Sequence, residues 1–272
     1  MIANARMYAV SLQAAGVWRA LLDALIEQAQ LPIDLIEHPP PLPIADLWER
    51  GDKAAVFMCG LPFSRAEPQP VPIAAPVPSP IEFGGEARYW SDMVVRADSA
   101  ALDIRDTFGH RIAFTTSESQ SGYAAALSYF MGVGDRFPLF CEVIAPQLTP
   151  LGALTAVLDG SADVAPIDAY ALRLLQRYRP ELTSQVRIVA STPARPIPIL
   201  VASSGGLEPL QNAFLEAHRH PSTRTLMQEL LLQRFEAPIA SAYDVLRQEF
   251  GRARRFWRER PLAAVIHPAF SG

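Results

Sequence analysis

Cysteine and basic charge are both scarce in this sequence. Its 272 residues include two cysteines, and no Cys-x-x-Cys pair or cysteine–histidine cluster occurs. This scarcity argues against a disulfide framework and against a structural zinc site. Lysine and arginine number 24 against 28 aspartates and glutamates, which gives a formal charge of −4. Because nucleic-acid-binding domains are usually basic, we expect no nucleic-acid partner.

Long apolar runs are missing as well. No stretch approaches the ~18 consecutive apolar residues of a membrane-spanning helix, so we expect no insertion into a membrane. Residues 1–30 lack the continuous apolar core and the small-residue cleavage site of a signal peptide. On these grounds alone a cytoplasmic location stays open.

Catalytic and cofactor motifs are a third absence. The sequence contains no His-Glu-x-x-His, no Gly-x-Gly-x-x-Gly, no P-loop and no Gly-x-Ser-x-Gly. Its five histidines form no catalytic pattern. We therefore expect a protein without a metal, a cofactor or catalytic residues.

The composition and periodicity that are present predict an α/β fold. Half of the residues are hydrophobic and 19% are charged, and the length exceeds that of one ordinary domain, so we expect two lobes. Apolar periodicity predicts three strands alternating with two helices, at 6–11, 14–30, 33–37, 44–50 and 54–58. This βαβαβ order is typical of a mostly parallel sheet with flanking helices. Six prolines within 68–80 predict an extended segment at a sheet edge or on the surface.

A second series of strands and helices follows, and the tail from 208 to 258 is predicted to be mostly helical. We assign residues 91–194 to a second lobe, and residues 1–90 plus 195–272 to a discontinuous first lobe. Because the chain crosses between the lobes twice, we expect a two-strand hinge and a ligand cleft between the lobes.

Residues 113–126 read "AFTTSESQSGYAAA", a strand end, a hydroxyl-rich loop and a helix start. The first turn of a helix presents unpaired N–H groups and about half a positive charge. Hydroxyls at Ser119 and Ser121 add donors, and Gly122 lets the backbone approach a ligand closely. Such a turn binds an oxyanion without a basic side chain. The alternative interpretation is an ordinary serine N-cap.

Two further candidates share this position at the carboxyl end of a predicted strand. Cys59 follows the strand at 54–58, and Asp168 follows one at 164–167. In open α/β sheets, ligands bind beyond the carboxyl ends of the strands. Burial as a small hydrophobe is the alternative for Cys59, and an N-cap is the alternative for Asp168.

An ordered set of motifs resembles the phosphate, phosphite and phosphonate substrate-binding proteins of ABC transporters. "SQSGY" (119–123) resembles the Ser-Thr-Ser-Gly turn of that family, with Gln120 where threonine is usual. The other matching segments, in family order, are "MY" (7–8), "CGLPF" (59–63), "YWSDMVVRADS" (89–99) and "AVLDGSADVAPIDAY" (156–170).

The resemblance implies a two-lobed fold of the type 2 periplasmic-binding-protein class and a set of ligand contacts. It places the anion contacts on Ser119, Gln120 and Ser121, a crossover aromatic on Tyr89, and an acidic cleft residue on Asp168. Further positions in or next to the matching segments complete the expected ligand-binding set. The whole set is Ser119, Gln120, Ser121, Gly122, Tyr89, Ser91, Asp168, Tyr8, Thr116 and Cys59. Core packing is the alternative for Tyr8 and Tyr89.

The leading functional hypothesis is a non-catalytic, monomeric binding protein that closes over a small anionic solute. The resemblance implies an ABC permease as partner and a periplasmic location. The alternative is a cytosolic enzyme of cofactor biosynthesis, or an effector-sensing domain, on the same fold. In the enzyme, Cys59, Asp168 or Glu118 would act as acid or base.

Overall fold

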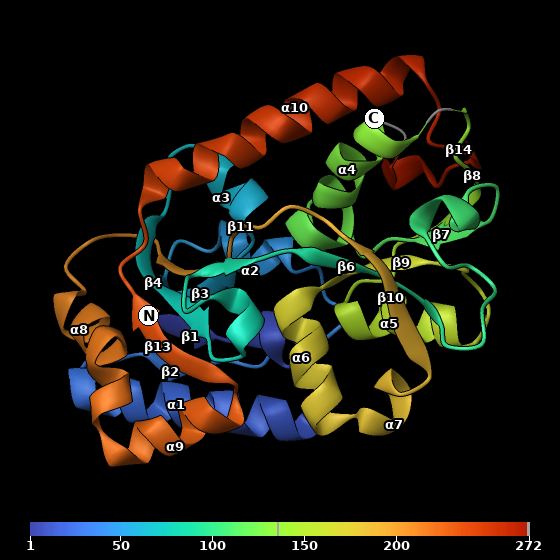
Figure 1. Ribbon diagram of the computed structural model, residues 1–272. Helices are drawn as coiled ribbons and strands as arrows, with labels where there is room; N and C mark the ends of the chain where they lie inside the picture. The colour runs from blue at the N-terminus through green and yellow to red at the C-terminus, as the bar shows by residue number, and fades with distance from the viewer. Residues whose placement is uncertain (135, 271–272) are drawn as a thin grey trace. The chain divides into compact units, whose positions relative to one another are not determined.

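The computed structural model describes residues 1–134 and 136–270, and the chain divides into two compact units (Figure 1). Unit 1 comprises Met1–Tyr89 and Pro196–Asp244, and unit 2 comprises Trp90–Arg195 and the segment from Val245 onward. The sequence placed this last segment in the first lobe instead. It belongs to unit 2 because it packs there: the indole Nε1 of Trp257 donates a 3.0 Å hydrogen bond to the carbonyl of Leu127.

Unit 1 is built on a six-stranded sheet with the strand order β13-β4-β12-β3-β1-β2. Figure 1 shows α1, α8 and α9 together on one side of it, and α8 and α9 both contact β13. The elements are β1 (Ile2–Asn4), α1 (Leu12–Ala29), β2 (Asp34–Leu35), α2 (Ala45–Glu49), β3 (Lys53–Met58), α3 (Gly60–Arg65), β4 (Val71–Pro78), β12 (Ile199–Ala202), α8 (Glu208–Glu216), α9 (Pro221–Glu229) and β13 (Leu232–Glu236).

The strand directions in this sheet separate the first pass of the chain from its return. β1 pairs in parallel with β2 and β3, whereas β12 is antiparallel to β3 and β4, and β13 is antiparallel to β4. β1 to β4 therefore run one way, and the two strands of the returning segment run the other way. The prediction of a mostly parallel sheet holds for the first pass only, and the complete sheet is mixed.

The proline-rich segment is an internal strand rather than an edge or surface segment. β4 lies between β12 and β13, with Pro72 opposite Val201 and Pro76 opposite Phe235. Both pairings contain a register shift, one at Leu200/Val201 and one at Leu232/Arg234. Such irregularities accommodate residues that have no N–H to donate, which explains how the sheet tolerates prolines in an inner strand.

The core of unit 1 forms around α1. Ser11 caps this helix by accepting a 3.0 Å hydrogen bond from the Ala14 amide, and Trp18 on its inner face is fully buried. The predicted strand at 6–11 is wrong: β1 ends at Asn4, and residues 6–8 form a 3₁₀ turn. That turn directs Tyr8 into the core, where its ring meets the rings of Trp18 and Phe57.

Unit 2 contains two three-stranded sheets, the antiparallel β10-β6-β9 and the parallel β14-β8-β7. A parallel bridge between Ile112 and Val164 connects β7 to the segment leading into β9. The elements are β6 (Ser91–Arg96), β7 (Arg111–Ala113), α4 (Ala125–Val133), β8 (Phe140–Ile144), α5 (Pro150–Leu158), β9 (Ala165–Asp168), α6 (Ala169–Tyr178), α7 (Pro180–Thr183), β10 (Val186–Ser191), α10 (Asp244–Glu259) and β14 (Ala263–Val265). Two short strands, β5 (Arg88–Tyr89) and β11 (Arg195–Pro196), form a further pair.

Asp163 joins β7 to the segment before β9, and this link predicts a pH-dependent stability. Asp163 accepts hydrogen bonds from the Arg111 amide and guanidinium at 2.9–3.2 Å. Burial alone raises the pKa of Asp163, but the Arg111 hydrogen bonds outweigh it and hold the pKa below its usual value. A carboxylate with a lowered pKa stabilises the fold above the unfolded-state pKa of about 4, and this contribution disappears as the pH falls.

We therefore expect Asp163→Asn to lower the free energy of unfolding by about 1 kcal/mol at neutral pH, a value reduced for the partial exposure of the pair. In urea titrations at several pH values, the difference in free energy of unfolding between the variant and the unmodified protein should disappear below about pH 4. The exposed Asp23→Asn on α1 is the matched control and should change little at any pH. If the difference in stability between Asp163→Asn and the unmodified protein persisted unchanged in acid, the stabilising role of the Asp163 carboxylate would be contradicted.

Candidate functional site

The segment after β7 folds into a serine turn, Ser119–Gly122, at the start of a helix. Ser119 caps the helix: its Oγ accepts a 2.9 Å hydrogen bond from the Gly122 amide. Gln120–Ala124 forms a π-helical turn, in which the Ala124 amide donates to the Ser119 carbonyl at 3.0 Å, and the chain then continues as α4. A helix was predicted here, but the wide turn was not. Such π turns occur frequently at functional sites.

The serine turn offers unsatisfied hydrogen-bond donors. Within the described residues, neither the Gln120 amide nor the Ser121 amide has an acceptor. Gln120 is buried, at 3% exposed, and its side-chain Oε1 also lacks a partner in this part of the chain. Because the continuous helix runs on to Val133, its peptide dipoles add positive potential at this end. The turn therefore has the donors and the potential that an oxyanion requires.

Gly122 has a packing role that the sequence did not reveal. A β-carbon built on Gly122 would lie 2.0 Å from Thr115 Oγ1, so glycine is required for this close approach. The Thr115 amide also donates to the Gly122 carbonyl at 3.3 Å. The glycine therefore makes room for Thr115, whereas the sequence-based hypothesis had assigned that space to a ligand.

Three of the predicted residues meet in one buried hydrogen-bond cluster. Ser91 on β6 lies directly opposite Asp168 at the end of β9. Ser91 Oγ donates to the Ser121 carbonyl at 2.7 Å, and Ser121 Oγ is 3.4 Å from Asp168 Oδ2. The other oxygen of Asp168 accepts from the Ala171 amide at 2.9 Å, which caps α6. Asp168 therefore acts as the N-cap of α6 and also contacts the serine turn.

This cluster changes the expected electrostatics of the site. The hydroxyls of Ser91 and Ser121 donate to protein acceptors, so the main-chain amides and Ser119 remain as the donors for an anion. Asp168 adds a carboxylate that is only 5% exposed. Burial raises the pKa of the neighbouring Tyr170 well above its usual value, and the charge of Asp168 adds to the shift, so this phenol stays neutral.

The remaining predicted residues lie outside this cluster. Tyr8, Tyr89 and Cys59 belong to unit 1 and are buried there, at 0%, 1% and 7% exposed. Both tyrosines are buried among the core residues of unit 1, as the alternative interpretation of core packing expected. Thr116 adjoins the serine turn, and its carbonyl accepts a 3.1 Å hydrogen bond from the Ser119 amide.

Sequence reasoning missed Thr192, whose Oγ1 accepts a 3.0 Å hydrogen bond from the Ser91 amide. These residues are 101 positions apart, and no local pattern marks Thr192. In the described part of the chain, no group of three or more His, Cys, Asp or Glu side chains is placed to hold a metal ion. No described helix combines the length and apolar character needed to cross a bilayer.

The sequence model of one protein family matches most of the chain. It describes the periplasmic substrate-binding protein of phosphonate ABC transporters and matches residues 12–243. Among curated proteins, none matches this chain.

Several solved structures share the fold of this chain. A binding-protein component of a phosphonate ABC transporter from Pseudomonas aeruginosa superposes with a TM-score of 0.79 at 17% identity, covering 95% of this chain and 88% of its own. A Prochlorococcus marinus protein in complex with methylphosphonate superposes with a TM-score of 0.74 at 16% identity, covering 93% of this chain and 97% of its own. A Xanthomonas citri protein bound to ATP superposes with a TM-score of 0.64 at 15% identity, covering 93% of this chain and 97% of its own. At these identities the likeness shows the fold, and it confirms the predicted type 2 periplasmic-binding-protein class.

Proposed function

Because this chain belongs to the family of periplasmic substrate-binding proteins of phosphonate ABC transporters, we propose that it binds a small phosphonate-like oxyanion at the serine turn. The family consists of substrate-binding proteins rather than enzymes, so the enzyme alternative is not retained. The proposal extends to an ABC permease as partner and the periplasm as location, both of which follow from the family description.

The donors of the serine turn carry the proposal. Two unpaired amides, those of Gln120 and Ser121, lie one after the other at the positive end of a helix. The Ser119 hydroxyl adjoins them, and it accepts from Gly122 while keeping its own proton available. Tetrahedral oxyanions are bound well by such consecutive N–H groups, which need no lysine or arginine.

Asp168 narrows the class of ligand. Its buried carboxylate lies 3.4 Å from the Ser121 hydroxyl and therefore opposes a second negative charge nearby. A ligand that carries an ammonium group beside its phosphonate turns this repulsion into an attraction. We therefore expect aminoethylphosphonate to bind more tightly than methylphosphonate, and both to bind more tightly than acetate.

Calorimetric titration with aminoethylphosphonate, methylphosphonate, phosphate and acetate tests the proposal. Ser119→Ala should weaken phosphonate binding about tenfold, because one charge-assisted hydrogen bond is lost. The matched control is Asp103→Ala, which removes a different helical cap in unit 2, where Asp103 accepts from the Arg105 amide. It should leave the affinity unchanged. The proposal fails if no phosphonate binds, or if both cap variants weaken binding equally.

A further inference from the structure

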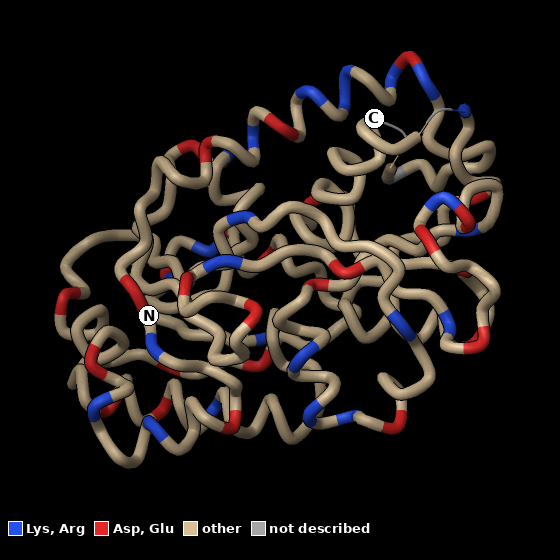
Figure 2. The backbone as a smooth tube through the Cα atoms, viewed as in Figure 1, with Lys and Arg blue, Asp and Glu red and all other residues tan. Residues whose placement is uncertain are grey.

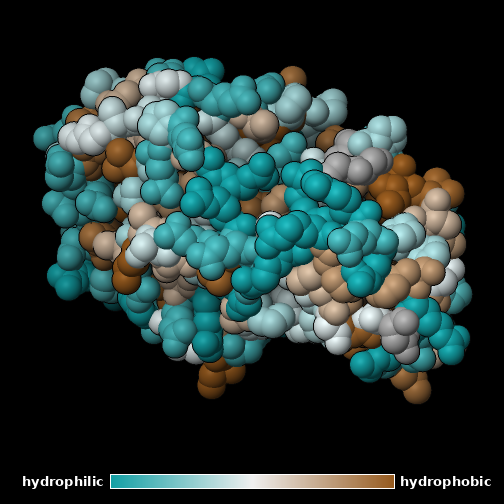
Figure 3. All heavy atoms as spheres, turned by 90° about the horizontal axis from the view of Figure 1, so that it is seen from above, coloured by the Kyte–Doolittle hydropathy of each residue, from teal (hydrophilic) through white to brown (hydrophobic). Residues whose placement is uncertain are grey.

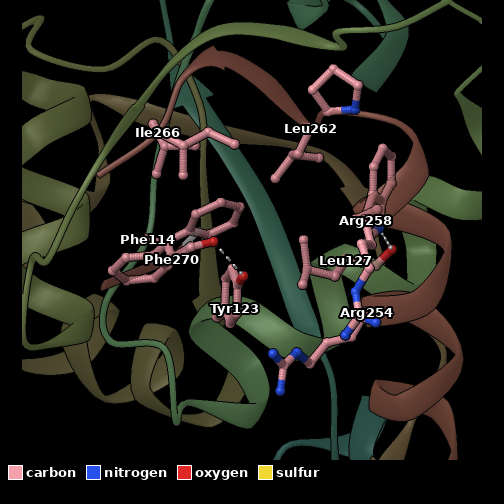
Figure 4. A pocket seen from close by; sticks show the side chains of 11 residues that line it. Phe114, Tyr123, Leu127, Arg254, Arg258, Leu262, Ile266 and Phe270 are labelled. Carbon is pink, nitrogen blue, oxygen red and sulfur yellow. Dashed lines mark hydrogen bonds between the residues drawn. The ribbon is translucent and has the colours of Figure 1, made fainter. Parts of the chain in front are cut away.

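Unit 2 contains a cavity of about 380 Å³ between α4 and the segment formed by α10 and β14. Its lining is largely apolar, and three aromatic rings form one wall, from Phe114, Tyr123 and Phe270. Figure 4 shows these rings on one side, with the arginines of α10 on the other. The size is within the range of pockets that hold small organic ligands.

The aromatic wall is fixed by its own contacts. Tyr123 meets Phe270 edge-on at 4.9 Å between ring centroids and meets Phe114 edge-on at 5.1 Å. Phe114 and Phe270 stack at 6.1 Å with an interplanar angle of 15°. The Tyr123 hydroxyl has one long hydrogen bond, 3.5 Å to the Phe270 carbonyl, shown as a dashed line in Figure 4. A polar group thus lies in an otherwise apolar wall and keeps capacity for a better partner.

Two positive charges line the same cavity. Arg254 and Arg258 are four residues apart on α10, so they extend from the same face of the helix. Neither guanidinium has a carboxylate or hydrogen-bond partner among the described residues, and that of Arg254 lies 5.9 Å from the centroid of the Phe250 ring. No described carboxylate therefore neutralises the two charges, which leaves them available to an anionic group.

Arg254 and Tyr123 line the same cavity. Burial raises the pKa of Tyr123, and the positive charge of Arg254 opposes part of that shift. Blue basic residues follow one another along α10 in Figure 2. Figure 3, which views the side carrying α10 in Figure 1, shows a predominantly hydrophilic face with smaller hydrophobic groups.

We propose that this cavity binds a small amphipathic carboxylate, with an aromatic or short aliphatic body against the ring wall and the carboxylate against Arg254 and Arg258. The planar guanidinium matches a carboxylate with two parallel hydrogen bonds, and the apolar body of the ligand leaves water when it packs against the rings. This site is separate from the serine turn, because none of Ser119, Gln120 and Ser121 lines it.

Cinnamate and its neutral amide, cinnamamide, have the same shape and test the proposal by calorimetry. The unmodified protein should bind cinnamate about tenfold or more tightly than cinnamamide. In the double variant Arg254→Gln with Arg258→Gln, this preference should fall below about threefold. The matched control is Arg247→Gln with Arg255→Gln, on the same helix but outside the cavity, which should keep the preference.

Three results would overturn the proposal: equal binding of the two compounds to the unmodified protein, no binding of either, or the same loss in both double variants. Saturation with methylphosphonate should leave cinnamate binding intact. Displacement by methylphosphonate would place cinnamate at the serine turn and would equally overturn the proposal. The comparison in the unmodified protein needs no variant, so a variant that folds poorly does not remove the test.

Discussion

Replacing Asp92 with alanine is expected to destabilise the protein by about 3–5 kcal/mol. Asp92, on β6 in unit 2, is 1% exposed. Its Oδ1 accepts from Trp90 Nε1 at 2.8 Å and from Ser191 Oγ at 2.6 Å. Its Oδ2 forms an ion pair with Arg173 on α6, at 3.5 Å. Removal of the buried carboxylate leaves the Trp90 and Ser191 donors and a largely buried guanidinium without this acceptor, and that loss is costly where the dielectric constant is low.

Thermal and urea unfolding measure the effect, and the same strand offers a matched control. Asp98 pairs with Arg96 just beyond the end of β6, but the pair is exposed, with side chains 68% and 48% accessible. Asp98→Ala should therefore cost less than about 0.5 kcal/mol. If the two alanine variants lost the same small amount of stability, the buried network around Asp92 would not be a main support of unit 2.

Replacing Gly122 with alanine is expected to cost about 2 kcal/mol, because the new methyl group overlaps Thr115. The methyl carbon would lie 2.0 Å from Thr115 Oγ1, 2.8 Å from its Cγ2 and 2.9 Å from its Cβ. A rotation of the threonine side chain relieves the first two contacts but not the third. The backbone of the serine turn must therefore shift, and the close pairing of Thr115 with Gly122 must loosen.

Gly132 on α4 provides a control of opposite sign. A β-carbon at Gly132 meets nothing within 4 Å. Gly132→Ala should therefore stabilise the protein by about 0.5 kcal/mol, because alanine loses less backbone entropy in a helix. Urea titration of both variants gives the comparison. A Gly122→Ala variant as stable as Gly132→Ala would show that glycine is not required at the serine turn.

The elements that local periodicity could predict are those with strong apolar patterns. The strand at 54–58 and the helix at 14–30 correspond closely to β3 and α1, where caps and buried stripes follow from residues near in sequence. The final helix was also expected, and α10 is present at Asp244–Glu259. Its place in unit 2 could not be predicted, because that depends on distant partners such as Leu127.

Other elements exist only because of tertiary pairing. The tail from 208 to 258 was predicted to be mostly helical, but within it Leu232–Glu236 pairs with β4 and becomes a strand. β14 was missed, since three residues carry no usable period until β8 lies beside them. The prolines of β4 indicated an edge, because local rules cannot anticipate register shifts in both neighbouring strands.

At the candidate site, too, the sequence predicted the contiguous motif but not the contacts that depend on the folded chain. The serine turn was recognised from "SQSGY", a contiguous motif that combines a cap, hydroxyls and a glycine. The hydrogen-bond partners that occupy the hydroxyls of Ser91 and Ser121 were not foreseen, because β6, β9 and the turn meet only in the folded chain. The hydroxyl count was therefore a poor guide to the free donors, which are mainly amides.

A crystal structure of the protein grown with methylphosphonate tests the central claim most directly. The account predicts phosphonate oxygens within about 3 Å of the Gln120 and Ser121 amide nitrogens and of Ser119 Oγ. A phosphonate bound elsewhere, with these two amides facing water or other protein atoms, would contradict it.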